Sequence, residues 1–212
     1  MKGTKLVSLG IIFLMFCLGA YFYNSLPEKI ASHWNAEGQV NGYMSKNMAL
    51  IFIPGLTLVL YGFFRLIPRI DPLKKNIAAF AGYYDNFVLA FTAFMLYIYC
   101  VTLVLNLGYG LSINSLLTPA MAALIFYTGV LLEKSRRNWF IGVRTPWTLS
   151  SDVVWDKTNK LGGKLFKVVG LFILLGIFLP NLLVYVILAP VLLVSLGLVV
   201  YSYVEYQKVG KA

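Results

Sequence analysis

Charged residues are scarce in this sequence. Asp, Glu, Lys and Arg make up 12% of the 212 residues, and 59% of the residues are hydrophobic. A typical soluble domain has about 25% charged and about 45 to 50% apolar residues, so this composition excludes a water-soluble globular protein. The chain contains instead six apolar stretches, each close to the roughly 20 residues that a helix needs to cross a bilayer.

Histidine and cysteine are almost absent. His33 is the single histidine, and Cys17 and Cys100 both lie inside apolar stretches. A zinc site would have to combine His33 with Glu28 or Glu37, and a Ser-His-Asp triad would depend on the same single histidine as its base, without a serine marked as a nucleophile. We therefore expect no metal, no cofactor, no catalytic residue and no enzymatic activity.

The interior of the apolar stretches also lacks ionisable groups, which enzymes and proton-coupled transporters usually place within the membrane. The charged residues nearest to the stretches stand at predicted helix ends: Arg65, Asp85, Glu133 and Glu205. The polar residues that remain inside the stretches are Thr57, Thr92, Thr102, Asn106, Thr128, Ser195 and Ser202. We interpret these polar side chains as hydrogen-bonding contacts between helices rather than as a path for a substrate.

The apolar stretches predict an all-α integral membrane protein, a bundle of about six transmembrane helices, because only helices and closed barrels satisfy the backbone in lipid. The expected spans are residues 6–23, 48–64, 87–107, 116–132, about 165–179 and 182–203. Pro180 and Asn181 place a turn between the last two spans, and Pro190 is expected to kink the last one. We expect two units, 1–66 with an outer loop at 24–47, and 67–212 with a cytoplasmic loop at 133–164.

Basic residues are distributed very unevenly between the two sides of such a bundle. With the N-terminus inside, only Lys29 and Lys46 of the 18 Lys and Arg residues lie outside, and the positive-inside rule favours this orientation. Both termini of a multi-pass plasma-membrane protein are then cytoplasmic. The net charge of +10 suits the anionic headgroups of the inner leaflet. We therefore expect the lipid bilayer as a partner and no direct binding of nucleic acid.

The outer loop contains candidate binding residues between turn-forming positions. Gly38 and the Asn41-Gly42 pair favour a short hairpin or a compact loop. Trp34 and Tyr43 are typical of an aromatic belt at the membrane interface and equally of a ligand-recognition surface, so both interpretations stay open. The candidate ligand-binding residues of this loop are His33, Trp34, Asn35 and Tyr43.

A second group of candidates lies in the cytoplasmic loop, where two tryptophans, two arginines and a proline occur within 15 residues. Such a segment is expected among the lipid headgroups, with guanidinium groups on phosphates or on helix-end carbonyls. Pro146 stiffens the turn between Arg144 and Trp147, which makes recognition the alternative to simple anchoring. The candidate ligand- or partner-binding residues here are Arg137, Asn138, Trp139, Arg144, Thr145, Pro146, Trp147 and Trp155.

A helix is expected directly after this segment, capped by Ser150 or Ser151 with Asp152 in its first turn. Apolar residues recur at helical spacing along it, opposite charged residues, which predicts an amphipathic cytoplasmic helix that lies on the membrane surface. Gly162 and Gly163 are expected to form a hinge between this interfacial helix and the fifth span.

The chain resembles a known family over nearly its whole length, and two stretches of sequence carry the resemblance. The more specific stretch reads RNWFIGVRTPWTLSS from Arg137 and WDKTNKLGG from Trp155, and it resembles the SdpI-type immunity proteins associated with the sporulation-delaying peptide toxin. The outer-loop stretch resembles the small N-terminal domain of unknown function that is often fused to this family. Its matching residues are Leu26-Pro27, His33-Trp34-Asn35, Gly38 and Gly42-Tyr43.

The resemblance implies a six-span plasma-membrane protein that protects the cell against a secreted, membrane-active peptide toxin. It implies a second role as a receptor that holds a cytoplasmic transcriptional repressor at the membrane. The alternative is a small transporter or exporter of a peptide or hydrophobic solute, with a path between helices and the Arg144 region as its cytoplasmic gate.

Overall fold

The computed structural model describes residues 2–209, and in that range six helices are long and apolar enough to cross a membrane. They are α1 (Lys2–Phe22), α2 (Lys46–Ile70), α4 (Ala81–Asn106), α5 (Ile113–Lys134), α7 (Asp152–Ile173) and α8 (Leu183–Val209). Shorter elements connect them: α3 (Lys74–Ala79), α6 (Pro146–Ser150), strands β1 (Lys29–Trp34) and β2 (Val40–Ser45), and the 3-10 turns η1 (Tyr23–Ser25), η2 (Leu174–Phe178) and η3 (Pro180–Leu182). The prediction of a helical multi-pass membrane protein is confirmed.

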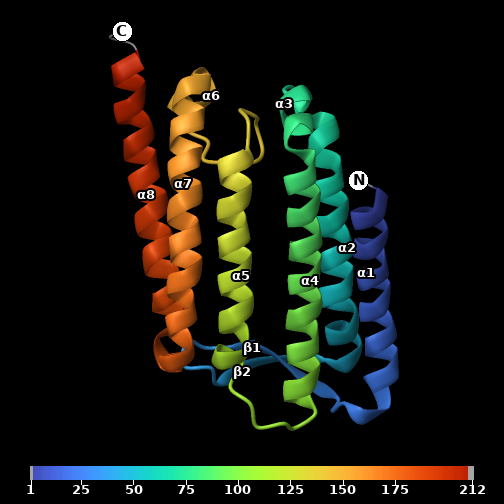
Figure 1. The fold of residues 1–212 in the computed structure, drawn as a ribbon. Helices are drawn as coiled ribbons and strands as arrows, with labels where there is room; N and C mark the ends of the chain where they lie inside the picture. Colours follow the sequence, from blue (N-terminus) through green and yellow to red (C-terminus); the bar gives the residue numbers. More distant parts are fainter. Residues whose placement is uncertain (1, 210–212) are drawn as a thin grey trace.

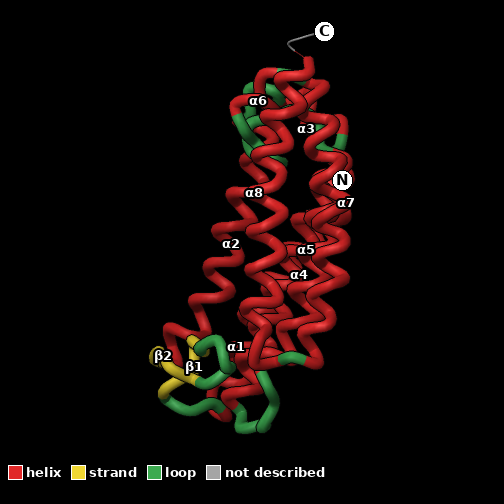
Figure 2. Tube along the Cα trace, turned by 90° about the vertical axis from the view of Figure 1, so that its left-hand side faces the viewer, coloured by secondary structure: helices red, strands yellow, loops and turns green. Residues whose placement is uncertain are grey.

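The long helices form two groups that stand side by side (Figure 1). Helices α1, α2 and α4 pack on one another in the first group, α5, α7 and α8 form the second, and α4 contacts α5 between them. The strands lie at one end of the bundle, and α3, α6 and the C-terminal end of α8 lie at the other (Figures 1 and 2). Helix α4 packs on α1 and α2 although it follows the expected unit boundary, and the division at residues 66 and 67 stays a prediction.

Apolar side chains are found both inside the bundle and on its surface. Met15 of α1, Leu50 of α2 and Tyr99 of α4 are buried against one another in the first group. Phe13 and Leu193 are about 70% exposed, at 69% and 71%. Surfaces with many such residues suit lipid tails rather than water.

The threonines within the spans do not make the contacts between helices that were expected. The hydroxyls of Thr57, Thr92, Thr102 and Thr128 donate to the carbonyl oxygen four residues earlier in their own helix, over 2.7 to 2.9 Å. This geometry is open to any helical threonine and satisfies the hydroxyl without a neighbouring helix. Ser202 does bridge elements, because its Oγ lies 3.0 Å from Oγ1 of Thr145 in the cytoplasmic loop.

The predicted amphipathic interfacial helix and the predicted fifth span are a single helix, α7. The expected hinge at residues 162–163 is therefore wrong. A Cβ atom at Gly163 would lie 2.6 Å from the backbone oxygen of Gly129 in α5, and one at Gly170 would lie 2.7 Å from the backbone nitrogen of Phe126. These glycines let the two backbones approach closely, as small residues commonly do between membrane helices. The face that was expected to lie on lipid packs on α5 and α8 instead.

The turn expected between the last two spans is confirmed. Turns η2 and η3 join α7 to α8, and Pro180 is the first residue of η3. Helix α8 continues through Pro190. The kink expected at that proline stays a prediction.

Candidate functional site

The loop that connects α5 to α6, which the sequence predicts to be cytoplasmic, is folded around Asn138, whose side chain is completely buried. Its amide oxygen accepts hydrogen bonds from the backbone N–H groups of Phe140 (2.9 Å) and Ile141 (2.6 Å). Its amide nitrogen donates to the carbonyl oxygens of Arg136 (2.8 Å) and Ile141 (2.7 Å). A buried amide that is satisfied in this way fixes the backbone around it, so Asn138 acts as the internal support of the loop.

The connection between α2 and α3 holds the same loop from the other helix group. Asp71 is 2% exposed, and its carboxylate accepts hydrogen bonds from the backbone N–H groups of Leu73 (2.6 Å) and Trp139 (2.9 Å). The side-chain nitrogen of Asn76 donates to the carbonyl oxygen of Arg137 over 2.7 Å. Trp139 thus has a fixed backbone, while its ring is 51% exposed.

Arg137 joins the two ends of the loop. Its Nε atom lies 2.7 Å from a carboxylate oxygen of Asp152, and its Nη1 atom donates to the carbonyl oxygen of Leu149 over 2.9 Å. The side chain of Ser151 accepts a hydrogen bond from the backbone of Val154, which confirms that Ser151 caps α7 with Asp152 in the first turn. The guanidinium of Arg137 is therefore engaged within the protein.

Trp155 and Asn159 of α7 enclose Gly142. Gly142 has φ +128°, and a Cβ atom there would lie 2.7 Å from a ring carbon of Trp155 and 2.8 Å from Oδ1 of Asn159. The same Oδ1 accepts a hydrogen bond from the backbone N–H of Val143 over 2.8 Å. Trp155 is 1% exposed and donates from Nε1 to the carbonyl oxygen of Ser135 over 3.3 Å. Its place is in the core, directly beneath the loop.

Thr145 begins α6 with a reciprocal cap. The backbone N–H of Thr148 donates to Oγ1 of Thr145, and the backbone N–H of Thr145 donates to Oγ1 of Thr148. Pro146 is the first residue of the helix, where its missing N–H costs nothing. The ring of Trp147 meets the ring of Tyr203 in α8 edge-on, with centroids 5.1 Å apart. The cap and the ring contact attach this part of the loop to α8.

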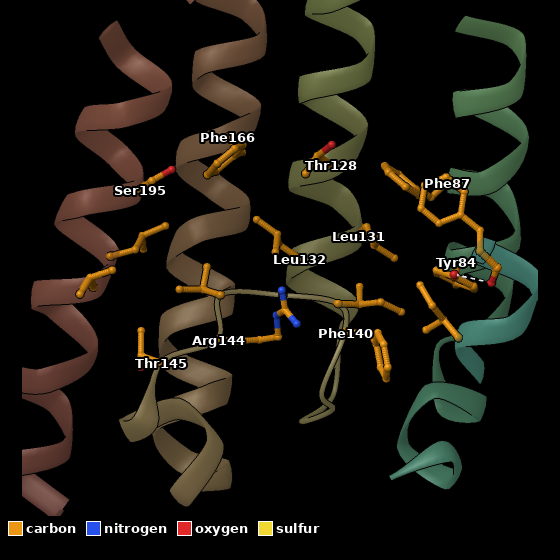
Figure 3. A pocket seen from close by; sticks show the side chains of 17 residues that line it. Tyr84, Phe87, Thr128, Leu131, Leu132, Phe140, Arg144, Thr145, Phe166 and Ser195 are labelled. Atoms are coloured by element: carbon orange, nitrogen blue, oxygen red, sulfur yellow. Dashed lines mark hydrogen bonds between the residues drawn. The ribbon is translucent and has the colours of Figure 1, made fainter. Parts of the chain in front are cut away.

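The loop closes one end of a cavity of about 430 Å³ between the two helix groups (Figure 3). This volume lies within the range of small-molecule sites. The walls are mainly apolar and come from five long helices and the loop; they include Phe64, Phe87, Leu131, Phe140, Phe166 and Leu198. Thr128, Thr145 and Ser195 add hydroxyl groups, and the hydroxyl of Tyr84 donates to the carbonyl oxygen of Phe64 over 2.7 Å.

Arg144 is the charged residue of this cavity. Its Nη1 atom donates to the carbonyl oxygen of Trp139 over 2.5 Å, and its guanidinium lies among the lining side chains in Figure 3. In the described range 2–209, Arg65 pairs with Asp85 and Arg137 pairs with Asp152, but Arg144 has no carboxylate within ion-pair distance. A guanidinium has five N–H donors, so the arrangement leaves donors for an anionic group in the cavity.

The outer loop is an antiparallel hairpin, as one of the two sequence interpretations predicted. Strands β1 and β2 pair from Lys29 opposite Ser45 to Trp34 opposite Val40. The side-chain oxygen of Asn35 accepts a hydrogen bond from the backbone of Gln39 over 2.8 Å and closes the turn. The ring of His33 is hydrogen-bonded to the side chain of Asn41, and Tyr43 is 62% exposed.

Two asparagines at the helix ends dock this hairpin. Asn106 of α4 accepts from the backbone N–H of Ala31 (2.7 Å) and donates to the carbonyl oxygen of the same residue (3.1 Å). Asn114 of α5 donates to the carbonyl oxygens of Ala36 (3.1 Å) and Pro180 (2.7 Å). The hairpin therefore covers the ends of both helix groups. Its candidate residues stand at the opposite end of the bundle from the cytoplasmic-loop candidates (Figure 1).

Apart from Arg144, which the transporter alternative placed beside a path between helices, the lining of the cavity was not predicted from the sequence. Phe64, Phe87 and Phe166 are ordinary residues of the expected apolar spans, and only their meeting between the helix groups makes them a wall. Thr128 and Ser195 were noted as polar residues within spans, which was the available signal. Over residues 2–209, no cluster of three or more His, Cys, Asp or Glu side chains could hold a metal ion, and the absence of enzymatic activity and of a cofactor stays a prediction.

Comparison with known proteins finds family matches to two segments of the chain and a similar immunity protein. Residues 134–202 match the SdpI/YfhL protein family, and residues 10–58 match the domain of unknown function DUF1648. The chain is 29% identical over 203 residues to the immunity protein SdpI of Bacillus subtilis (strain 168), which covers 95% of this chain and 94% of that protein. No solved structure matches the chain. The first family match contains the cytoplasmic loop and the second contains the hairpin, so the resemblance seen in the sequence is confirmed, and the chain carries an SdpI/YfhL family segment behind a DUF1648 segment.

Proposed function

We propose that this protein protects the cell that makes it against a secreted, membrane-active peptide toxin. The observation that carries the proposal is the similarity to an immunity protein over 95% of the chain, which includes both the hairpin and the cytoplasmic loop. A similarity of this extent leaves no large part of the chain for an unrelated activity.

The geometry of the cytoplasmic loop supports recognition rather than simple anchoring. Anchoring in headgroups needs only exposed aromatic and basic side chains. Here the buried Asn138 and Asp71 fix the backbone, and the fixed backbone directs Arg144 into a cavity. A flexible anchor would not need these buried polar contacts, each of which costs free energy unless it is satisfied.

The experiment is expression of the full chain in a bacterium that is sensitive to the sporulation-delaying peptide toxin. Cells that carry the protein should survive a toxin concentration that kills cells with an empty vector. Arg144→Gln should lose protection, whereas Arg136→Gln, which changes an exposed arginine of the same loop, should keep it. Equal killing of cells that express the wild-type protein at normal levels and of vector controls would contradict the proposal.

The proposed orientation places both termini in the cytoplasm and the hairpin outside the plasma membrane. The hairpin lies at one end of the bundle, and α3 and α6 lie at the other (Figure 2). Single cysteines at the two ends can therefore test which end faces the outside of the cell. In a variant without the free thiols of Cys17 and Cys100, a cysteine at exposed Glu37 should react with an impermeant maleimide in intact cells. One at exposed Ser150 should react only after the cells are opened, and labelling of intact cells at Ser150 would reverse the topology.

The second part of the proposal is a signalling role, in which the toxin-bound protein holds a cytoplasmic transcriptional repressor at the membrane. It is supported by Trp139, whose half-exposed ring stands on a backbone fixed by Asp71. Exposed aromatic residues on rigid supports are typical interface anchors. Toxin should increase transcription of the genes beside the one for this protein in wild-type cells, and Trp139→Ala should abolish the increase without loss of survival. Transcription that does not respond to toxin in wild-type cells would exclude this role.

A second candidate function is export of a peptide or hydrophobic solute, which the Arg144 cavity between the helix groups favours. The amount of toxin that stays on the cell distinguishes export from protection by binding. Export predicts that protected cells carry less labelled toxin than sensitive cells, whereas binding predicts that they carry as much or more.

A further inference from the structure

The charge of Arg144 is not balanced by the surrounding protein. Within the described residues, each carboxylate near the loop end of the bundle already has partners. These carboxylates are Asp71 with backbone N–H groups, Asp85 with Arg65, Glu133 with Lys167, Asp152 with Arg137, Asp156 with Lys160, and Glu205 with Lys157 and Lys208. Arg144 itself is exposed, and its guanidinium keeps N–H donors beyond the one that bonds the carbonyl oxygen of Trp139. An anion from outside the chain can therefore pair with Arg144 beside the apolar walls of the cavity.

The cavity is amphipathic along its length. Arg144 and Thr145 lie at the loop, and Thr128, Phe166 and Ser195 lie further into the bundle (Figure 3). Thr128 precedes the last residue of α5 by six positions, which corresponds to about 9 Å along the helix. A ligand that fits would have its charge at the end of the bundle and an apolar chain directed toward the middle of the membrane.

The volume of the cavity favours a lipid chain over a peptide as its occupant. A helix about 10 Å across with a rise of about 1.5 Å per residue fills roughly 120 Å³ per residue. The cavity of about 430 Å³ would hold fewer than about four such residues. A longer helical peptide is too large for the cavity, whereas a single unbranched hydrocarbon chain is much thinner than a helix and can enter it.

We propose that this cavity binds an anionic phospholipid of the inner leaflet, with its phosphate on Arg144 and one acyl chain between the helix groups. A phosphate accepts two parallel hydrogen bonds from a guanidinium. The cytoplasmic leaflet is rich in anionic lipids, and the headgroup lies there at the depth of the loop. The bound lipid fills the space between α2 and α4 on one side and α5, α7 and α8 on the other, and so couples the two helix groups. The lipid site shares Arg144 with the proposed protection role, but lipid binding is measured without toxin, so the two proposals can fail separately.

Native mass spectrometry of the purified full-length protein in mild detergent tests the proposal without toxin. Phosphatidylglycerol and phosphatidylcholine with identical acyl chains are added in turn. The wild-type protein should retain one phosphatidylglycerol at least about tenfold more tightly than phosphatidylcholine. Both lipids present a phosphate to Arg144, but the choline cation of phosphatidylcholine opposes the positive charge of the guanidinium. Arg144→Gln should lose the preference and Arg144→Lys should keep part of it, whereas Arg136→Gln should bind like the wild type.

A cavity variant tests the position of the acyl chain. Ser195→Phe puts a ring into the cavity and leaves Arg144 in place, so it should reduce retention of phosphatidylglycerol at least about tenfold. Retention by Ser195→Phe equal to the wild type would overturn the placement of the chain. Equal retention of the two lipids would overturn the assignment to an anionic lipid. Equal retention by the Arg144→Gln and Arg136→Gln proteins would overturn the site at Arg144. Oleate retained as tightly as phosphatidylglycerol would overturn the assignment to a phospholipid.

Discussion

Replacement of Gly142 by alanine tests the support of the loop most directly. The backbone there has φ +128°, and the added methyl group would meet Trp155 at 2.7 Å and Asn159 at 2.8 Å. A positive φ costs a non-glycine residue about 1 to 2 kcal/mol, and forcing an extra methyl group into a packed core costs about 1 to 3 kcal/mol. Gly142→Ala should therefore lower the free energy of unfolding by about 2 to 5 kcal/mol if the costs add.

Gly108 provides the matched control, because it combines a positive φ of +89° with open space around the position of a Cβ atom. Gly108→Ala should carry only the backbone cost of about 1 to 2 kcal/mol. The difference between the two variants reports the contact with Trp155 and Asn159. For a chain of this size that difference corresponds to a midpoint of thermal unfolding lower by about 2 to 12 °C in Gly142→Ala.

The assay is thermal unfolding of the two purified variants in the same detergent, followed by near-ultraviolet circular dichroism, with protection against toxin measured in parallel. Gly142→Ala should also lose protection, because Arg144 follows two residues later on the displaced backbone. Equal midpoints for the two variants would refute the close approach of α7 to the loop. Full protection by a destabilised Gly142→Ala protein would refute the link between the loop and the function.

Three further predictions address packing, recognition and the hairpin. Gly163→Ala should destabilise the protein by about 1 to 3 kcal/mol, because its methyl group would approach a backbone oxygen of α5 at 2.6 Å. Gly197→Ala is the control and should not destabilise the protein, because its methyl group would meet nothing within 4 Å. Equal midpoints of thermal unfolding for the two variants would contradict close packing of α5 on α7. Arg144→Lys and Trp147→Leu should each insert normally, as judged by membrane fractionation, but abolish protection or signalling, and wild-type activity in both would reduce the loop to an anchor. His33→Gln should preserve expression and reduce protection only in part, because glutamine can keep a side-chain hydrogen bond in the hairpin; complete loss in a well-expressed protein would reopen a catalytic or metal role.

The membrane spans and the local caps could be predicted from the sequence because they depend on properties of contiguous residues. Transfer of about 20 apolar residues into lipid is favourable wherever they stand in the fold. The turn of the hairpin follows in the same way from Gly38, whereas the turn expected at Asn41-Gly42 is wrong, because both residues lie inside strand β2. The start of α7 follows from the capping side chain of Ser151. None of these features requires a partner distant in the chain.

The role of the glycines in α7 could not be predicted in this way. Gly162 and Gly163 suit a hinge and a close helix contact equally, since both exploit the missing side chain. Only the position of Gly129 in α5, 34 residues earlier in the sequence, decides for the contact. The same applies to Asn106, which the sequence indicated as a contact between helices and which the structure places against the backbone of the hairpin.

The composition of the loop between α5 and α7 predicted Arg137, Asn138, Arg144 and Trp155 as candidate binding residues, because aromatic, basic and turn-forming residues are rarely concentrated between membrane spans. Tertiary structure alone separated their surroundings. Asn138 and Trp155 are buried supports, Arg137 is paired with a carboxylate, and Arg144 lines a cavity without such a partner among the described residues. Hydropathy is a property of each segment, so the sequence by itself determined the membrane fold. Burial and charge pairing depend on which atoms meet across helices, so only the packed bundle decided which of these side chains are buried, paired or unpaired.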